Sequence, residues 1–205
     1  MIYLIRHGET VGNAGNRHQT PDVLLNDQGY IQARLRAETL RDKAINKIIT
    51  SPYTRAQQTA KIIQTELGLS IPIDLDDNLR EMKHPSVLEG RLKTDPDIVQ
   101  LKAEIDSNRL NPRYRHSDEE TLFMLYDRVM NLLDSLVQDE NTVLISHGGL
   151  LRMVLSYIQT QGDAHASAAH FMDLDIAAFP LNNAAMLTLE YKNSKWMMHE
   201  LHNIC

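Results

Sequence analysis

The chain has 205 residues, of which 42% are hydrophobic and 23% charged, and its net charge is −6. This composition is typical of a water-soluble globular protein, and no apolar run is long enough to span a membrane. The acidic charge argues against nucleic acid as a partner, although a small phosphorylated substrate can still bind in a local positive pocket. Because the N-terminus lacks a signal-peptide pattern and Cys205 is the only cysteine, we expect a cytoplasmic protein.

The first segments alternate between strand and helix patterns. An unbroken apolar run at residues 2–5 predicts a strand buried on both faces, which is typical of parallel sheets. The polar stretch 11–25 indicates a loop at the end of that strand. Asn26 is suited to cap a following helix, which has Tyr30 and Ala33 on its apolar side.

Another strand, a helix and a short strand are expected before residue 76. Residues 47–50 suit the strand, and Ser51-Pro52 predicts the start of the helix, because serine caps helices and proline is favoured at the first helical position. Gly68 is expected to end this helix. Residues 71–75 suit the short strand that follows.

Residues 76–120 are irregular and highly charged, and we expect them to form a lid-like excursion over the end of the sheet. Asp118 is expected to cap a long helix with a leucine-rich buried side. A second buried strand at residues 142–145 runs into another helix. After a polar, histidine-containing stretch, the chain closes with two strands at residues 185–191 and 195–201.

This alternation predicts an α/β fold with a mostly parallel sheet, helices on both faces and the closing hairpin as an antiparallel edge. No composition shift marks a boundary, so residues 1–205 are expected to form a single domain. Parallel strands end at one rim of a sheet, where open α/β sheets bind their ligands. Reactive side chains that follow different strands should therefore meet.

Three segments place reactive side chains directly after a predicted strand. They are Arg6-His7-Gly8, the stretch from Ser51 to Arg55, and Ser146-His147-Gly148. If the strands are parallel neighbours, two imidazoles and two guanidiniums surround one site. Arginine forks bind phosphate oxygens, and the start of a helix at Arg55 adds a favourable dipole. The pattern predicts a phosphate site that needs no metal ion or other cofactor.

A phosphorus atom held at this site is open to attack by His7, which gives a phosphohistidine. We expect a backbone carbonyl near Gly8 to hold the other ring nitrogen. Asn13 is expected to add a hydrogen bond, and His147 to neutralise the transferring group. Glu81 is the candidate acid for the leaving oxygen, and it would later activate the water that hydrolyses the intermediate.

Together these motifs resemble the signature of the histidine phosphatase superfamily, also called phosphoglycerate mutase-like. They are Arg6-His7-Gly8-Glu9-Thr10 with Asn13, Ser51-Pro52-x-x-Arg55-Ala56-x-Gln58-Thr59-Ala60, Leu79-Arg80-Glu81 and Ser146-His147-Gly148-Gly149. The resemblance covers nearly the whole chain and implies a three-layer α/β/α sandwich. It implies His7 as the phosphorylated nucleophile and Glu81 as the proton donor. It also implies Arg6, Arg55 and His147 as the phosphate pocket, to which we assign Asn13 and Gly148 as well.

The chain departs from the family pattern in its substrate-facing segment. Leu88-Glu89-Gly90 stands where many phosphatase members have Trp-Glu-Gly. Glu120 and Arg128 have the separation of a Glu–Arg pair of the family, but in a different local sequence. The physiological substrate, the role of residues 91–120 and the oligomeric state are therefore not predicted.

Some of these residues have other interpretations. His7 and His147 could ligate a metal, but two neighbouring arginines would repel a cation. His165 and His170 could belong to a metal site as well, although polar loops often carry such histidines. Two other carboxylates compete for the acid role: Glu9 and Glu89.

Three functions are compatible with these residues. The first is a metal-independent phosphomonoesterase that acts on a small phosphorylated metabolite through a phosphohistidine on His7. The second is a mutase that returns the phosphoryl group to a sugar acid; the modest stretch between Gly90 and Glu120 favours hydrolysis, because mutase relatives tend to carry a longer insertion. The third is a non-catalytic module that binds phosphorylated ligands, which the complete set of catalytic residues argues against.

Overall fold

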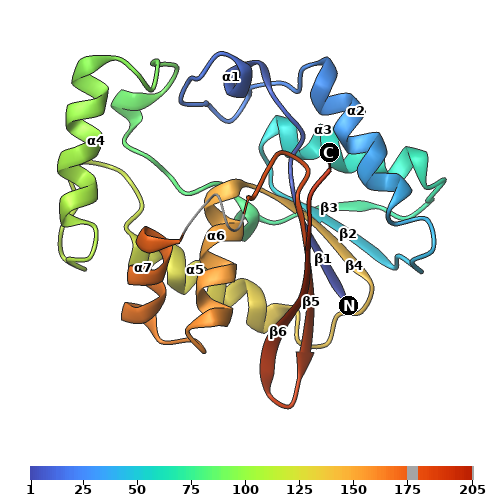
Figure 1. Cartoon of the computed structure of the whole chain (residues 1–205). Helices are drawn as coiled ribbons and strands as arrows, with labels where there is room; N and C mark the ends of the chain where they lie inside the picture. Colours follow the sequence, from blue (N-terminus) through green and yellow to red (C-terminus); the bar gives the residue numbers. More distant parts are fainter. Residues whose placement is uncertain (175–179, 205) are drawn as a thin grey trace.

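The computed structural model describes residues 1–174 and 180–204, so the predictions for Cys205 lie outside the described residues. A six-stranded sheet in the order β3-β2-β4-β1-β5-β6 crosses the molecule (Figure 1). Four strands run parallel: β1 (Ile2–Arg6), β2 (Lys47–Thr50), β3 (Ile73–Leu75) and β4 (Thr142–Ser146). The edge formed by β5 (Met186–Lys192) and β6 (Lys195–His202) is antiparallel. The prediction of a mostly parallel sheet with an antiparallel edge is confirmed.

Helices cover both faces of the sheet, which confirms the three-layer sandwich (Figure 1). One face carries α2 (Asp27–Glu38) and α3 (Thr54–Glu66). The other carries α5 (Leu122–Ser135), α6 (Gly148–Gln159) and α7 (Ala164–Asp173). None of the helices in the described ranges combines the length and apolar character needed to cross a membrane.

Strand β1 contributes to both hydrophobic cores. Tyr3 and Ile5 pack in the cluster with α2 and α3, whereas Ile2 and Leu4 pack in the cluster with α5, α6 and α7. Successive side chains of a strand point to opposite faces, so a strand that is covered on both faces must be apolar at every position. This explains the unbroken apolar run at the start of the chain.

The helix predicted to open at Ser51-Pro52 begins at Thr54 instead. Ser51 remains extended, because its N–H donates to the Ile145 carbonyl and prolongs the pairing of β2 with β4 by one residue. The side chain of Ser51 therefore takes part in the site described below rather than in a helix cap.

Two other helix starts differ from the predictions. The stretch 11–25, expected to be a loop, begins with the short helix α1 (Val11–Ala14), because Thr10 and Asn13 form a reciprocal capping box. Helix α5 is capped by Thr121 and not by Asp118, which instead accepts hydrogen bonds from Ser86.

Two further expectations about helices are wrong. The polar stretch after α6 forms α7, which Asp163 caps. Tyr30, expected on the apolar side of α2, is 42% exposed, because the buried side of this helix is narrow and centres on Ala33 and Ala37. In contrast, Asn26 caps α2 and Gly68 follows the end of α3 with a positive φ, both as predicted.

Residues 76–120 leave the sheet and return to it at α5. They contain the 3-10 turns η1 (Asp77–Leu79) and η2 (Ser86–Leu88), and α4 (Pro96–Asn108), which stands away from the sheet in Figure 1. The loop after α1 contacts this segment through an isolated antiparallel β-bridge between Arg17 and Leu92. The Gly90 N–H also donates a hydrogen bond to the His18 carbonyl. The action of this segment as a lid stays a prediction.

Candidate active site

The register of the central strands brings the two motif histidines together. Strands β1 and β4 pair in parallel with Arg6 opposite Ser146, so the next residues, His7 and His147, emerge side by side. Their ring centroids lie 5.1 Å apart with an edge-to-face arrangement. Strand β2 lies on the other side of β4 and delivers Ser51 and the start of α3 to the same rim. The three segments selected from the sequence thus converge at one place.

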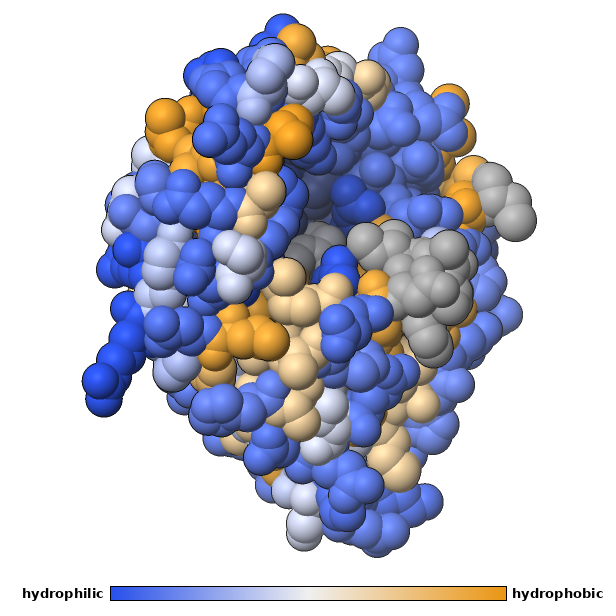
Figure 2. Space-filling model, turned by 60° about the vertical axis from the view of Figure 1, so that its left-hand side comes forward, coloured by the Kyte–Doolittle hydropathy of each residue, from blue (hydrophilic) through white to orange (hydrophobic). Residues whose placement is uncertain are grey.

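A cavity of about 140 Å³ opens at this rim. Figure 2 shows the molecule hollowed on the side of α4 and α7, with hydrophilic residues around much of the hollow. Most residues selected from the sequence line the cavity: Arg6, His7, Asn13, Arg55 and Glu81. His147 is fully buried beside His7 and does not line the cavity. Gly148 lines an adjoining cavity instead.

His7 is held in one tautomer. Its Nδ1 lies 2.6 Å from the Gly8 carbonyl, and because a carbonyl only accepts, Nδ1 carries the proton and Nε2 has the lone pair. Nε2 faces Arg55, whose Nε donates to it at 3.2 Å. Burial, and then the charges of Arg55 and Arg6, hold the pKa of His7 well below its ordinary value. The neutral ring therefore presents its lone pair to the arginine side of the cavity.

Two guanidiniums give the cavity its positive charge. Arg6 donates from Nη1 to the Leu181 carbonyl at 2.6 Å, and Arg55 donates to the Thr20 carbonyl at 2.9 Å. Burial lowers the pKa of both, and Glu81 is the carboxylate that opposes this shift in each case. Two positive charges that share one carboxylate favour a phosphate dianion between them.

Glu81 is anchored at the N-terminus of α6. Its Oε1 accepts hydrogen bonds from the Met82 N–H at 2.9 Å and from the Gly149 N–H at 3.0 Å. Of the two competing carboxylates, Glu89 also lines the cavity, whereas Glu9 accepts from Asn26 at 2.7 Å and does not line it.

The loop before Glu81 is fixed by the Glu120–Arg128 pair. Arg128 and Glu120 lie 2.7 Å apart with 9% and 13% of their side chains exposed, so this is a largely buried pair and not a surface pair. Arg128 also donates to the carbonyls of Asn78 and Arg80, at 2.7 and 2.8 Å. The pair therefore positions the backbone that carries the candidate acid.

Gly149 is needed for the approach of Glu81 to α6. A Cβ at Gly149 would lie 2.5 Å from Glu81 Oε1, whereas a Cβ at Gly148 would lie 3.5 Å from the nearest atom, Arg6 Nε, which is ordinary contact. We expect Gly149→Ala to displace Glu81 and to lower kcat for alkyl phosphates by about 10²-fold, with a smaller loss for p-nitrophenyl phosphate. Gly148→Ala is the matched control. Equal losses for the two esters, or equal behaviour of the two variants, would show that Glu81 is not the acid.

The other motif histidine is hydrogen-bonded to Ser51. The Ser51 hydroxyl lies 2.8 Å from His147 Nε2 and accepts a bond from the Tyr53 N–H at 3.3 Å, so one of its two lone pairs is occupied and its own proton is available to Nε2. Nδ1 of His147 is buried and has no hydrogen-bond partner in the described part of the chain. Burial and Arg55 lower the pKa of His147 well below its ordinary value. When Ser51 donates to Nε2, His147 is a neutral ring with an unused N–H at Nδ1.

Ser51→Ala is expected to lower kcat about fivefold, because it removes one buried hydrogen bond that sets the His147 tautomer. Nitrogen NMR of the ring should show the proton distributed over both nitrogens. Ser135→Ala, which removes an exposed hydroxyl bonded to the Leu132 carbonyl, is the control. An unchanged His147 tautomer in the Ser51 variant would rule out this positioning role.

Several cavity residues were not selected from the sequence. Tyr53 packs against the His147 ring at 5.1 Å and under the Arg55 guanidinium at 5.0 Å. His18 and Lys93 line the outer wall, where the loop after α1 meets the excursion. No local motif marks these two residues, because only their tertiary pairing places them at the site. Lys83 and His84, from the excursion, line the cavity as well.

The histidines considered for a metal site have other partners. His165 packs edge-to-face on Phe123, and His170 Nδ1 lies 3.0 Å from the Ser156 hydroxyl. Across residues 1–174 and 180–204, no three His, Cys, Asp or Glu side chains are placed to share an ion.

Comparisons with known proteins agree with this geometry. The family described as "Histidine phosphatase superfamily (branch 1)" matches residues 2–204. A probable phosphoglycerate mutase GpmB of Yersinia pestis is 32% identical over 202 residues, which cover 96% of this chain and 87% of the relative. This chain belongs to the histidine phosphatase superfamily. The resemblance inferred from the four motifs is confirmed.

Solved structures that carry phosphatase names share the fold of this superfamily member. A mycobacterial glucosyl-3-phosphoglycerate phosphatase has a TM-score of 0.74 and 25% identity, covering 97% of this chain and 96% of its own. The alpha-ribazole phosphatase of Shigella flexneri has a TM-score of 0.78 and 21% identity, covering 98% and 96%. The similar proteins therefore carry both mutase and phosphatase names.

Proposed function

We propose that this protein is a metal-independent phosphomonoesterase that hydrolyses a small phosphorylated metabolite through a phosphohistidine on His7. The observation that carries the proposal is the fixed tautomer of His7. Its proton is tied to the Gly8 carbonyl, and its lone pair faces Arg55 inside a cavity that Arg6 and Glu81 also line.

In the first step, the phosphoryl group lies between Arg55 and Arg6, which neutralise its oxygens. His7 Nε2 attacks phosphorus, so that a P–N bond forms while the P–O bond to the alcohol breaks. Protonated Glu81 gives its proton to the leaving oxygen, which departs as a neutral alcohol. His147 donates its Nδ1–H to the transferring group. Positioning and charge neutralisation supply most of the rate enhancement in such transfers.

In the second step, the Glu81 carboxylate takes a proton from water as the water oxygen attacks phosphorus. The P–N bond breaks, inorganic phosphate forms and His7 returns to its neutral form. Glu81 ends the cycle protonated, ready for the next ester. The two N–H donors on Glu81 Oε1 keep the carboxyl group in place through both steps.

Mutase activity is the second candidate, because the Yersinia relative carries a mutase name. Incubation with 3-phosphoglycerate and a trace of 2,3-bisphosphoglycerate separates the two reactions. We expect slow or no formation of 2-phosphoglycerate, and release of phosphate from the preferred ester. Rapid formation of 2-phosphoglycerate without free phosphate would contradict hydrolysis. A failure to turn over p-nitrophenyl phosphate at any pH from acid to neutral, with phosphate still bound, would indicate a binding module.

The ordinary pKa of a histidine ring is 6.5, and that of His7 is lowered well below this value. We therefore predict that the His7 ring is still neutral when the pH falls below 6.5. The acid limb of the kcat/KM profile should therefore not report protonation of His7 near that value. Arg55→Met should raise the His7 pKa, because it removes the larger of the two charges that disfavour protonation. Histidine NMR titration of the free protein measures this, with the exposed Arg34→Met as control. An unchanged His7 pKa would contradict the predicted coupling.

A further inference from the structure

A second cavity, of about 300 Å³, adjoins the first on the side of α6 and α7. The two cavities share Arg6, Glu81, Met82 and His84, so Glu81 stands between them. An ester oxygen must lie beside Glu81 to receive its proton. With the phosphoryl group beside His7 in the smaller cavity, the larger cavity is left for the alcohol part of the substrate.

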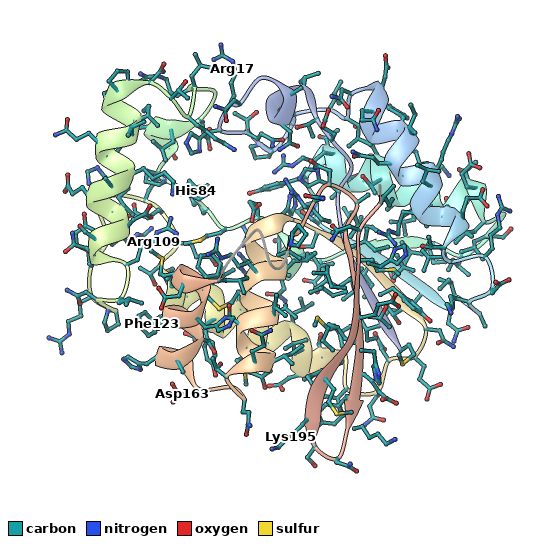
Figure 3. The ribbon with its side chains drawn as sticks, in the orientation of Figure 1. Arg17, His84, Arg109, Phe123, Asp163 and Lys195 are labelled. Atoms are coloured by element: carbon teal, nitrogen blue, oxygen red, sulfur yellow. The ribbon has the colours of Figure 1, made fainter. Side chains whose placement is uncertain are left out.

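One wall of the second cavity is cationic. Lys102 and Arg109 reach it from the α4 side and Arg152 from α6, and Figure 3 shows Arg109 and His84 in the space between α4 and α6. Lys102 and Arg109 share a single carboxylate, Asp106, at 3.1 and 3.0 Å. The side chain of Arg152 donates to backbone carbonyls at 3.2 and 3.3 Å. Positive charge is therefore concentrated here in a chain whose net charge is −6.

Positive charge outweighs negative charge on this wall. Asp106 is the carboxylate that pairs with both Lys102 and Arg109, and the hydrogen bonds of Arg152 in the described residues go to backbone carbonyls. Burial, and then Arg109 and Lys102, lower the pKa of His84 to about 4, so its ring is neutral at physiological pH. An anion in the cavity would balance the charge of these side chains.

Apolar side chains also line this cavity. They are Met82, Phe171 and Leu174, and the Arg152 guanidinium lies 4.8 Å from the centre of the Phe171 ring. A ligand that fits both kinds of lining has a hydrocarbon or aromatic body and a negative group.

We propose that this second cavity receives the alcohol part of the substrate, and that this part is an apolar body ending in an anion, either a carboxylate or a second phosphate. The inference rests on the proposed function, because Glu81 must protonate the oxygen from which this body extends. It assigns the choice of substrate to Arg109, Arg152 and Lys102.

Matched aryl esters test this inference. The ester 4-carboxyphenyl phosphate carries the anion, 4-carbamoylphenyl phosphate is its neutral counterpart of similar shape, and 1,4-phenylene bisphosphate tests a phosphate in place of the carboxylate. We expect kcat/KM to favour at least one anionic ester over the neutral one by about tenfold, as for a charged hydrogen bond. This ratio should fall towards one in Arg109→Gln and Arg152→Gln, and should persist in Arg34→Gln.

Equal kcat/KM for all three esters would overturn the inference and leave hydrolysis intact. If none is turned over and no phosphohistidine forms, the proposed function fails instead. In that case calorimetry with His7→Ala decides the matter: about tenfold tighter binding of an anionic ester supports the cavity assignment, and equal affinities contradict it. If the buried arginine variants do not fold, Lys102→Gln, at an exposed position, must lower the same ratio, and an unchanged ratio contradicts the inference.

Discussion

Replacing His7 with alanine is expected to lower kcat for p-nitrophenyl phosphate by about 10⁴-fold or more, because it removes the atom that forms the P–N bond. Among the described histidines that line the cavity, His7 is the one whose lone-pair nitrogen meets a cavity arginine, Arg55, at 3.2 Å; His18 and His84 lie further out along the cavity wall. Phosphate release measures the loss. A positively charged cavity should remain, so inorganic phosphate should still bind.

His199→Ala is the matched control for this variant. His199 lies on β6, is 43% exposed and pairs with Glu190, far along the chain from the motifs. Its replacement should leave turnover within about twofold, as expected of a surface change. Substantial hydrolysis by a folded His7→Ala protein would mean that another group is the nucleophile.

Replacing Glu81 with glutamine is expected to lower kcat for an alkyl phosphate by about 10²- to 10⁴-fold, and for p-nitrophenyl phosphate by much less. Glutamine can still accept from the Gly149 N–H, but it cannot supply a proton to the leaving oxygen. An alkoxide needs that proton, whereas p-nitrophenolate leaves without it. The ratio of the two kcat values therefore isolates the acid role from any change in substrate binding.

Glu89→Gln provides the comparison, since Glu89 is the other candidate acid that lines the cavity. This replacement should lower kcat for the two esters by the same small factor. If the dependence on the leaving group appears in the Glu89 variant and not in the Glu81 variant, the acid is Glu89.

The central part of the fold could be predicted because local sequence and tertiary environment agree there. Residues 2–5 and 143–145 are apolar at every position, and the structure buries both strands between two helical layers. Helix starts were less predictable. Serine is a residue type that often caps helices, but a hydrogen bond to the neighbouring strand keeps Ser51 extended. Such a contact between distant segments has no signal in the local sequence.

The inner site could likewise be predicted, because each of its residues follows a strand or begins a helix. Arg6 and His7 end β1, and Arg55 lies in the first turn of α3. The outer wall could not be predicted. His18 and Lys93 meet there only because two irregular segments pair, and Arg109 reaches its cavity from beyond α4. The residues that we propose to bind phosphate could therefore be predicted from the sequence, whereas those that we propose to select the alcohol could not.

The claim that a phosphoryl group passes through His7 has one direct test. The protein is mixed with a radiolabelled phosphomonoester, the reaction is stopped with base within a single turnover, and the labelled peptide is sequenced. We expect label on the peptide that contains His7, stable to base and released by acid, as phosphoramidates are. Label on a different residue, or phosphate release in which no protein-bound label forms at any time, would contradict the mechanism.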